Sequence, residues 1–200
     1  SENGHRYYTH KKYIGNRGMN MKLLPLQTFY MHTEFSEHNK IKRELLQKIK
    51  LTEANIPDGE SFLTDWNKHE ARDFTRPYVK YILPFLKPYI NEMIKQNHMQ
   101  NCKIHNIWFQ QYEKGDEHKW HIHPETNWTN VYYVEMMDNM QTELYDTNTK
   151  NIHKLNVKEG DLISFPAHII HRAPRNTQEI RKTIISFNTS FDGDISIDTN

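Results

Sequence analysis

From Lys103 onward the chain consists of short apolar segments separated by turns, and this pattern limits the possible folds more than any other feature. The segments are rich in aromatic and β-branched residues, which favour β-strands. Turn sequences such as Glu159-Gly160-Asp161 separate them. We expect strands over residues 103–112, 129–136, 141–146, 161–165 and 182–191. Short strands that follow one another at roughly ten-residue spacing are typical of an antiparallel barrel or a double-sheet jelly roll.

The first half of the chain has helical rather than strand periodicity. Ile41, Leu45 and Ile49 recur every fourth residue and predict an amphipathic helix over residues 37–50. Residues 76–97 also have helical spacing, but Pro84 and Pro88 interrupt it. We therefore expect a helix after Pro88 and a kinked or broken segment before it.

The predicted fold class is α+β with a mainly β core. The core is expected to be a double-stranded β-helix of the jelly-roll or cupin type, with supporting N-terminal helices. Two hundred residues most simply form one domain. We expect that domain to span residues 19–200, with 19–100 as a helical support layer and 101–200 as the jelly-roll core. Residues 1–18 are polar, basic and tyrosine-rich without periodicity, which predicts a leader, an arm or an expression-derived segment.

Composition limits the partners and the setting. Lys+Arg (26) and Asp+Glu (25) nearly balance, which argues against nucleic acid as a partner. No run approaches the ~20 apolar residues that span a bilayer, so no membrane partner is predicted. A single cysteine, Cys102, rules out an internal disulfide and indicates a reducing, cytoplasmic (intracellular) location. The sequence carries no signal for the oligomeric state.

His121 and His123 are the first candidates for metal ligation. They are separated by one residue, so in an extended segment both imidazoles point to the same side. Two neutral imidazoles can occupy adjacent positions around one metal ion and need a third ligand from elsewhere. Glu125 lies two residues beyond His123 and is an alternative ligand to it, although Pro124 is expected to bend the chain there.

A second histidine pair follows the strand predicted at residues 161–165. Phe165-Pro166 ends that strand, and His168 and His171 come next in an apolar segment. Either histidine could reach the first pair at the mouth of a barrel, where ligands from distant parts of a chain converge.

In this order, these residues resemble the iron(II)- and 2-oxoglutarate-dependent oxygenases, in particular their small microbial and phage-type members. The resemblance runs from about Tyr112 to Ser190. It rests on five motifs: Tyr112 and Gly115 followed by His121; His121-Ile122-His123-Pro124 followed by residues 131–134; Gly160–Pro166 followed by His171-Arg172; Arg181-Lys182-Thr183, ten residues past His171; and Ile185-Ser186-Phe187-Asn188 as the closing strand.

The resemblance implies Fe(II) as the metal, 2-oxoglutarate as the cosubstrate, and His121, His123 and His171 as the metal ligands. It implies that Arg181 and Thr183 hold the far carboxylate of 2-oxoglutarate. Tyr132 and Tyr133 alternate faces, so one of them is expected to point inward, either to contact 2-oxoglutarate or to pack in the core; Tyr133 is the predicted contact. The spacing to Arg181 favours His171 over His168. This chain departs from the family at His123, which stands where the family has an acid. Three neutral ligands leave Fe(II) at a charge of +2 instead of the +1 that an acid would give.

The function implied is hydroxylation of an unidentified small molecule or side chain. The three-histidine set also leaves an alternative open, a metal-binding cupin-like protein that does not use 2-oxoglutarate. That protein would be either a three-histidine dioxygenase or a non-catalytic binding module. Loops around residues 113–119 and 136–141 are expected to set specificity, because loops vary freely on a shared scaffold.

Overall fold

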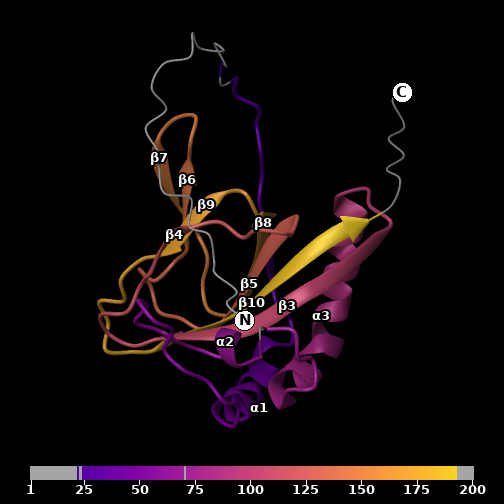
Figure 1. Ribbon diagram of the computed structural model, residues 1–200. Helices are drawn as coiled ribbons and strands as arrows, with labels where there is room; N and C mark the ends of the chain where they lie inside the picture. The colour runs from indigo at the N-terminus through magenta and orange to yellow at the C-terminus, as the bar shows by residue number, and fades with distance from the viewer. Residues whose placement is uncertain (1–21, 23, 70, 193–200) are drawn as a thin grey trace, which may run out of the picture.

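The computed structural model describes residues 22, 24–69 and 71–192 (Figure 1). The predictions for residues 1–18 lie outside the described residues. Two antiparallel sheets form the body of the fold, which is the double-stranded β-helix predicted from the sequence. The larger sheet has the strand order β1-β8-β5-β10-β3-β2, and the smaller has the order β4-β9-β6-β7.

The strands of the larger sheet come from both halves of the chain. Its members are β1 (Met31–Glu34), β2 (Leu63–Thr64), β3 (Asn101–Tyr112), β5 (Trp128–Glu135), β8 (Asp161–Pro166) and β10 (Lys182–Asp192). The smaller sheet contains β4 (His118–His121), β6 (Glu143–Asp146), β7 (Asn151–Lys154) and β9 (Ile170–Ala173). All five predicted strands are present. β1 and β2 show that the first half of the chain contributes to the larger sheet as well as to the helical layer.

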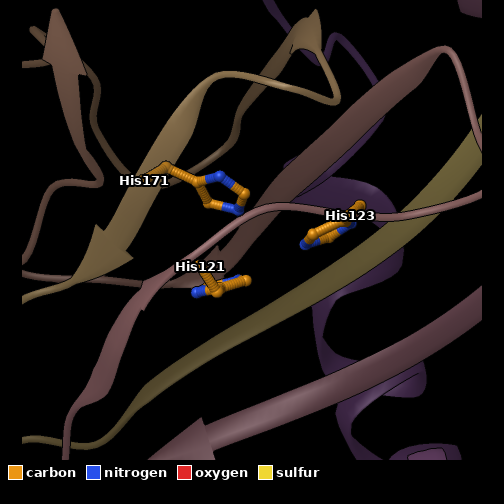
Figure 2. Close-up of side chains that lie close together, drawn as sticks. All are labelled: His121, His123 and His171. Carbon is orange, nitrogen blue, oxygen red and sulfur yellow. The ribbon is translucent and has the colours of Figure 1, made fainter. Parts of the chain in front are cut away.

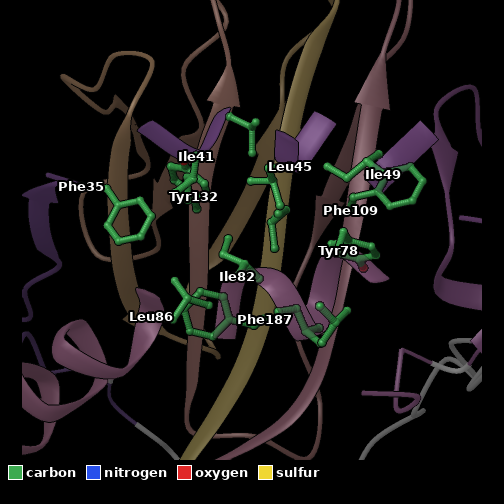
Figure 3. Close-up of a cluster of buried hydrophobic side chains, with 14 of the residues drawn as sticks. Phe35, Ile41, Leu45, Ile49, Tyr78, Ile82, Leu86, Phe109, Tyr132 and Phe187 are labelled. Atoms are coloured by element: carbon green, nitrogen blue, oxygen red, sulfur yellow. The ribbon is translucent and has the colours of Figure 1, made fainter. Parts of the chain in front are cut away.

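Helices α1 (His38–Lys50) and α3 (Pro77–Gln96) lie along one face of the larger sheet, on the side away from the smaller sheet (Figure 1). A short helix, α2 (Trp66–His69), precedes α3. The predicted stripe of α1 is buried, since Ile41, Leu45 and Ile49 are almost fully removed from solvent. Figure 3 shows these side chains packed between the helices and the sheet against Tyr132 and Phe187. Burial of this apolar surface holds the helices on the sheet.

Of the kinked or broken segment predicted before Pro88, the break is wrong. α3 runs without interruption through Pro84 and Pro88. Each proline removes one backbone donor, so the carbonyls of Lys80 and Pro84 lose their helical partners. All three residues lie on the exposed side of α3, where water can bond to these carbonyls at little cost.

A second apolar core fills the space between the two sheets. It includes Tyr112, Tyr133 and Ile184 from the larger sheet and Leu144 from the smaller one. β10 therefore has one face toward the helices, with Ile185 and Phe187, and one toward the smaller sheet, with Ile184. This alternation decides which residues of β10 can face a site between the sheets.

A buried ion pair fastens the segment before α3 to the larger sheet. Arg76 and Asp65 form a close charged contact, and both side chains are almost completely buried. Asp65 Oδ1 accepts a hydrogen bond from Phe109 N at 3.0 Å, and the Arg76 guanidinium donates to Ile107 O at 2.6 Å.

None of the helices in the described part of the chain has the length and apolar character needed to span a membrane.

Candidate metal centre

His121, His123 and His171 lie together between the two sheets. β4 ends at His121, and β9 carries His171 directly opposite it in register. His123 follows β4 by two residues, and its backbone N–H donates to Ala167 O at 3.1 Å. The ring centroids are 4.2 Å apart for His121 and His171, 4.9 Å for His123 and His171, and 5.3 Å for His121 and His123. Figure 2 shows the three rings directed into one space.

This grouping matches a metal centre in size. One ligand nitrogen from each ring can be chosen so that all lie within 4.8 Å of one another. Nitrogens that share an ion at ~2.1 Å and right angles are about 3 Å apart, so side-chain adjustments of ångström size would close the set. The two alternative ligands are elsewhere: Glu125 and His168 are exposed, and neither belongs to the cluster.

Hydrogen bonds fix the same tautomer in all three rings. His121 Nδ1 is 2.7 Å from Lys119 O, and His171 Nδ1 is 2.9 Å from Ile169 O. His123 Nδ1 is 2.7 Å from Asn188 Oδ1. Each partner is an oxygen acceptor, so each Nδ1 carries the proton and each Nε2 keeps its lone pair free. Neutral imidazoles oriented in this way are the form that binds a metal ion.

The surroundings keep these imidazoles neutral. Burial, with a smaller effect from His121, lowers the pKa of His123 to about 4 against the opposing hydrogen bond to Asn188. Burial, with smaller effects from His121 and His123, lowers the pKa of His171 to about 2. Burial also lowers the pKa of His121. In the described residues the cluster includes no carboxylate. A divalent ion held here therefore keeps its full charge of +2, as the sequence implied.

A fourth histidine, His118, lies against this cluster. Its ring stacks on His121 with centroids 3.8 Å apart, and burial lowers its pKa to about 3. His118 Nδ1 accepts a hydrogen bond from Gln110 Nε2 at 3.3 Å, so its proton is on Nε2. This tautomer is the opposite of that in the other three rings. His118 therefore lines the site with an Nε2–H that can donate a hydrogen bond, and it lacks the free Nε2 of the other three.

Arg181 and Thr183 are placed on the other side of the larger sheet. Arg181 donates twice to Glu135 Oε2, at 3.1 and 3.0 Å, and Thr183 Oγ1 donates to the same oxygen at 2.5 Å. Arg181 also lines a cavity of about 420 Å³ together with residues of α1 such as Leu46 and Ile49. The two residues share a face, as the sequence indicated, but it is the face toward the helices. The structure does not bring them to the histidines.

Lys182, between them, takes the opposite face and was missed from the sequence. Its side chain is buried between the sheets, where Nζ lies 5.4 Å from the Tyr112 ring centroid and 5.7 Å from that of Tyr133. Nζ donates to Met140 O at 2.6 Å, and among the described residues no carboxylate pairs with it. Burial lowers the pKa of Lys182 to about 7. Tyr133 was predicted at the site and lies beside this ammonium, with its hydroxyl donating to Thr142 Oγ1 at 2.7 Å.

Several solved structures share this fold. A 2OG-Fe(II) oxygenase family oxidoreductase from Burkholderia pseudomallei aligns over 80% of this chain and 84% of its own, with a TM-score of 0.64 and 9% identity. A Pseudomonas putida prolyl-4-hydroxylase aligns over 83% and 94%, with a TM-score of 0.60 and 11% identity. HygX from Streptomyces hygroscopicus, solved with nickel, 2-oxoglutarate and hygromycin B bound, aligns over 82% and 83%, with a TM-score of 0.59 and 7% identity.

The chain has the fold of the 2OG-Fe(II) oxygenases. At these identities the likeness is one of fold, and it confirms the resemblance seen in the sequence at that level. No protein-family model and no curated protein matches the chain by sequence. The three-histidine cluster, with its free Nε2 atoms, fits a divalent metal such as the Fe(II) of these oxygenases.

Proposed function

We propose that this chain is an Fe(II)- and 2-oxoglutarate-dependent dioxygenase that hydroxylates a small molecule or a side chain. The observation that carries the proposal is a set of three converging imidazoles in a double-stranded β-helix, His171 buried and His121 and His123 half-buried, each with Nδ1 bonded to an oxygen and Nε2 free. Iron with 2-oxoglutarate supplies the oxidation: the oxo acid, dioxygen and a substrate C–H bond give succinate, carbon dioxide and an alcohol.

His121, His123 and His171 would hold the metal on one face. Three protein ligands leave open positions for the oxo-acid end of 2-oxoglutarate and for dioxygen. The absence of a ligand carboxylate from the cluster suits a dianionic cosubstrate, because the dianion would neutralise the +2 charge that three imidazoles leave.

Lys182 replaces Arg181 in our proposal as the group that binds the far carboxylate of 2-oxoglutarate. A buried ammonium without a carboxylate partner is costly in the free protein, and a bound dianion would supply the missing charge. The rings of Tyr112 and Tyr133 lie next to the Lys182 ammonium. Tyr133 therefore stays in the proposed cosubstrate site. Arg181 and Thr183 become structural residues that hold Glu135 against the helical side of the sheet.

The substrate would approach on the side of the cluster that faces Trp108. The Trp108 ring lies 5.6 Å from His123, and it meets the partly exposed Trp66 edge-on at 4.6 Å. Trp108, beside His123, and Trp66, which packs against Trp108, would provide an apolar, aromatic surface for part of a substrate. Solved structures of this fold carry varied ligands, including hygromycin B in HygX and a hypoxia-inducible factor peptide in a Trichoplax adhaerens prolyl hydroxylase.

The proposal is tested by uncoupled turnover. Purified protein with Fe(II), ascorbate and oxygen is expected to convert 2-oxoglutarate to succinate, slowly in the absence of substrate and faster when the correct substrate is added. The variant His171→Ala is expected to form none. Iron-loaded protein that produces no succinate above the level of this variant, with or without a substrate library, would contradict the proposal.

The three-histidine set also supports a second candidate, a metal-binding cupin-like protein that does not use 2-oxoglutarate. The two candidates differ in one anaerobic experiment. With Co(II) bound, 2-oxoglutarate is expected to change the visible spectrum of the metal if it is the cosubstrate. A spectrum that does not respond to saturating 2-oxoglutarate favours the second candidate.

A further inference from the structure

The three histidines differ in what holds their Nδ1 protons. His121 and His171 each donate to the backbone carbonyl two residues earlier, at Lys119 and Ile169. These bonds are local and depend on the strand backbone. His123 instead donates to a side chain, Asn188 Oδ1, which is 65 residues away in the sequence and lies on β10. The ligand that stands in place of the expected acid is thus the one with a long-range side-chain partner.

Asn188 is itself held in one orientation. It is 3% exposed, and its Nδ2 donates to Asn106 Oδ1 at 3.3 Å. Asn106 is the residue directly opposite Asn188 in the pairing of β10 with β3. An amide has a donor end and an acceptor end, so a bond from Nδ2 to Asn106 turns Oδ1 toward His123. A β-bulge follows immediately, between Asn188 and Thr189, and bulges commonly re-aim side chains near active sites.

The direction of the amide decides which nitrogen of His123 can bind a metal. With Oδ1 toward the ring, Nδ1 must carry the proton and Nε2 is free. With Nδ2 toward the ring, Nδ1 would have to accept, the proton would move to Nε2, and the ligand atom would be blocked. A neutral partner also adds no negative charge behind the ligand, unlike the carboxylates that often support metal-bound histidines.

We propose that Asn188, oriented by Asn106, is the positioning residue that makes His123 a metal ligand by fixing its Nδ1–H tautomer. The proposal rests on the proposed function only in taking His123 as a ligand, since the tautomer is a property of the metal-free protein. In this proposal His123, supported by Asn188, occupies the ligand position at which the family has an acidic residue. It also explains how a neutral side chain can be held firmly enough to serve there.

The test compares three variants with the native protein. Asn188→Ala removes the acceptor. Asn188→Asp keeps an acceptor and adds a charge. The matched control is Asn130→Ala, which removes another fully buried amide; Asn130 Nδ2 bonds to Phe187 O and Thr189 Oγ1, on either side of Asn188, and Asn130 does not belong to the histidine cluster. The readouts are the His123 tautomer from ¹⁵N NMR of metal-free protein, the Kd for Co(II), and the melting temperature.

Native protein is expected to show Nδ1–H at His123. In Asn188→Ala the His123 signals are expected to indicate a mixture of tautomers, and the Kd for Co(II) is expected to rise by about 10- to 100-fold. Asn188→Asp is expected to retain Nδ1–H and to bind Co(II) at least as tightly as native protein. Asn130→Ala is expected to lower the melting temperature and to leave the Kd for Co(II) within about twofold of native.

Three results would overturn the proposal: Nε2–H at His123 in native protein, an unchanged Kd in Asn188→Ala, or an equal loss of affinity in Asn188→Ala and Asn130→Ala. If Asn188→Ala does not fold, Asn188→Asp decides, because a Kd more than tenfold weaker than native contradicts the role of an acceptor. Failure of the proposed function gives a different result. Native protein would then bind Co(II) without any response to 2-oxoglutarate, while the tautomer of His123 would still be decided by NMR.

Discussion

The substitution Lys182→Met separates the proposed cosubstrate site from the one expected from the sequence. It replaces a buried ammonium with an apolar chain of similar length, in a space walled by Tyr112 and Tyr133. The matched control is Arg181→Ala, one residue earlier on the opposite face of the sheet, where it removes the ion pair with Glu135.

The expected loss can be worked out from the burial of this group. A hydrogen bond to a charged group contributes about 1.5–3 kcal/mol, and leaving a buried charge without its partner costs about 2–5 kcal/mol. The bound carboxylate would lose the charged partner that we propose for it, so about 3 kcal/mol is expected. That corresponds to an increase of about 150-fold in the Kd for 2-oxoglutarate. Arg181→Ala is expected to change this Kd by less than about threefold, because its contacts are on the helical side.

Calorimetric titration of 2-oxoglutarate into metal-loaded, oxygen-free protein measures both values. The melting temperature shows whether the variants are folded. Burial lowers the pKa of Lys182 to about 7, so the free protein bears a cost for this group that methionine removes. Lys182→Met is therefore expected to fold without loss of stability. The reasoning is refuted if Arg181→Ala abolishes binding of 2-oxoglutarate while Lys182→Met retains it.

Four further predictions concern pH (two of them), metal and the buried ion pair. Burial lowers the pKa of Lys182 to about 7, and the bound dianion needs the ammonium form. The affinity for 2-oxoglutarate is therefore expected to be constant below pH 7 and to fall up to tenfold per pH unit above it. Calorimetry at several pH values measures this profile, and an affinity that stays constant up to about pH 9 contradicts the prediction. Between about pH 7 and 10 the unfolded chain binds more protons at Lys182 than the folded protein without 2-oxoglutarate does, because burial lowers the pKa in the folded state. The contribution of Lys182 to the free energy of unfolding therefore rises with pH across that window. Chemical denaturation of Lys182→Met should lack this rise. Ni(II) at about 100 times its Kd is expected to stabilise native protein by about 2.7 kcal/mol and to leave the melting temperature of His171→Ala unchanged; an equal shift in both would place the metal elsewhere. Arg76→Met is expected to cost about 3–5 kcal/mol in urea denaturation, since it leaves the buried Asp65 carboxylate without its ion partner, and the double variant with Asp65→Leu should be more stable than Arg76→Met alone.

The histidine cluster could be predicted from the sequence because it depends on the alternation of side chains along an extended segment. An extended segment places His121 and His123 on one side whatever the rest of the chain does. The turn and strand pattern then allowed His171 to lie opposite, where the pairing of β4 with β9 places it. The double-stranded β-helix was accessible for a similar reason, since each strand is marked by its own residues and bounded by its own turns.

The cosubstrate side that we propose for the site could not be predicted in this way, because β10 is buried on both faces. Ile185 and Phe187 pack toward the helices, whereas Ile184 packs toward the smaller sheet. When both faces are apolar, hydrophobic alternation does not say which one is the site. The resemblance to a family motif pointed to Arg181 and Thr183, while the fold turned Lys182 inward.

The role that we propose for Asn188 could not be predicted from the sequence for a different reason. Its role depends on the exact register of β10 with β3 and on the bulge after it. A one-residue shift in register exchanges the faces of a strand, and no local pattern records a bulge at this position. The unbroken helix α3 also depends on tertiary context. Pro84 and Pro88 are tolerated because the carbonyls left without helical partners, those of Lys80 and Pro84, belong to residues on the exposed side of the helix.

The anaerobic visible spectrum of the Fe(II)-loaded protein is the most direct test of the central claim, a three-histidine centre that binds 2-oxoglutarate. A 2-oxo acid that chelates Fe(II) through its carboxylate and keto oxygens gives a metal-to-ligand charge-transfer absorption. We expect such an absorption to appear on titration with 2-oxoglutarate, to saturate at one equivalent per iron, and to be absent from His123→Ala. Iron bound at full stoichiometry with no new absorption at saturating 2-oxoglutarate would contradict the account.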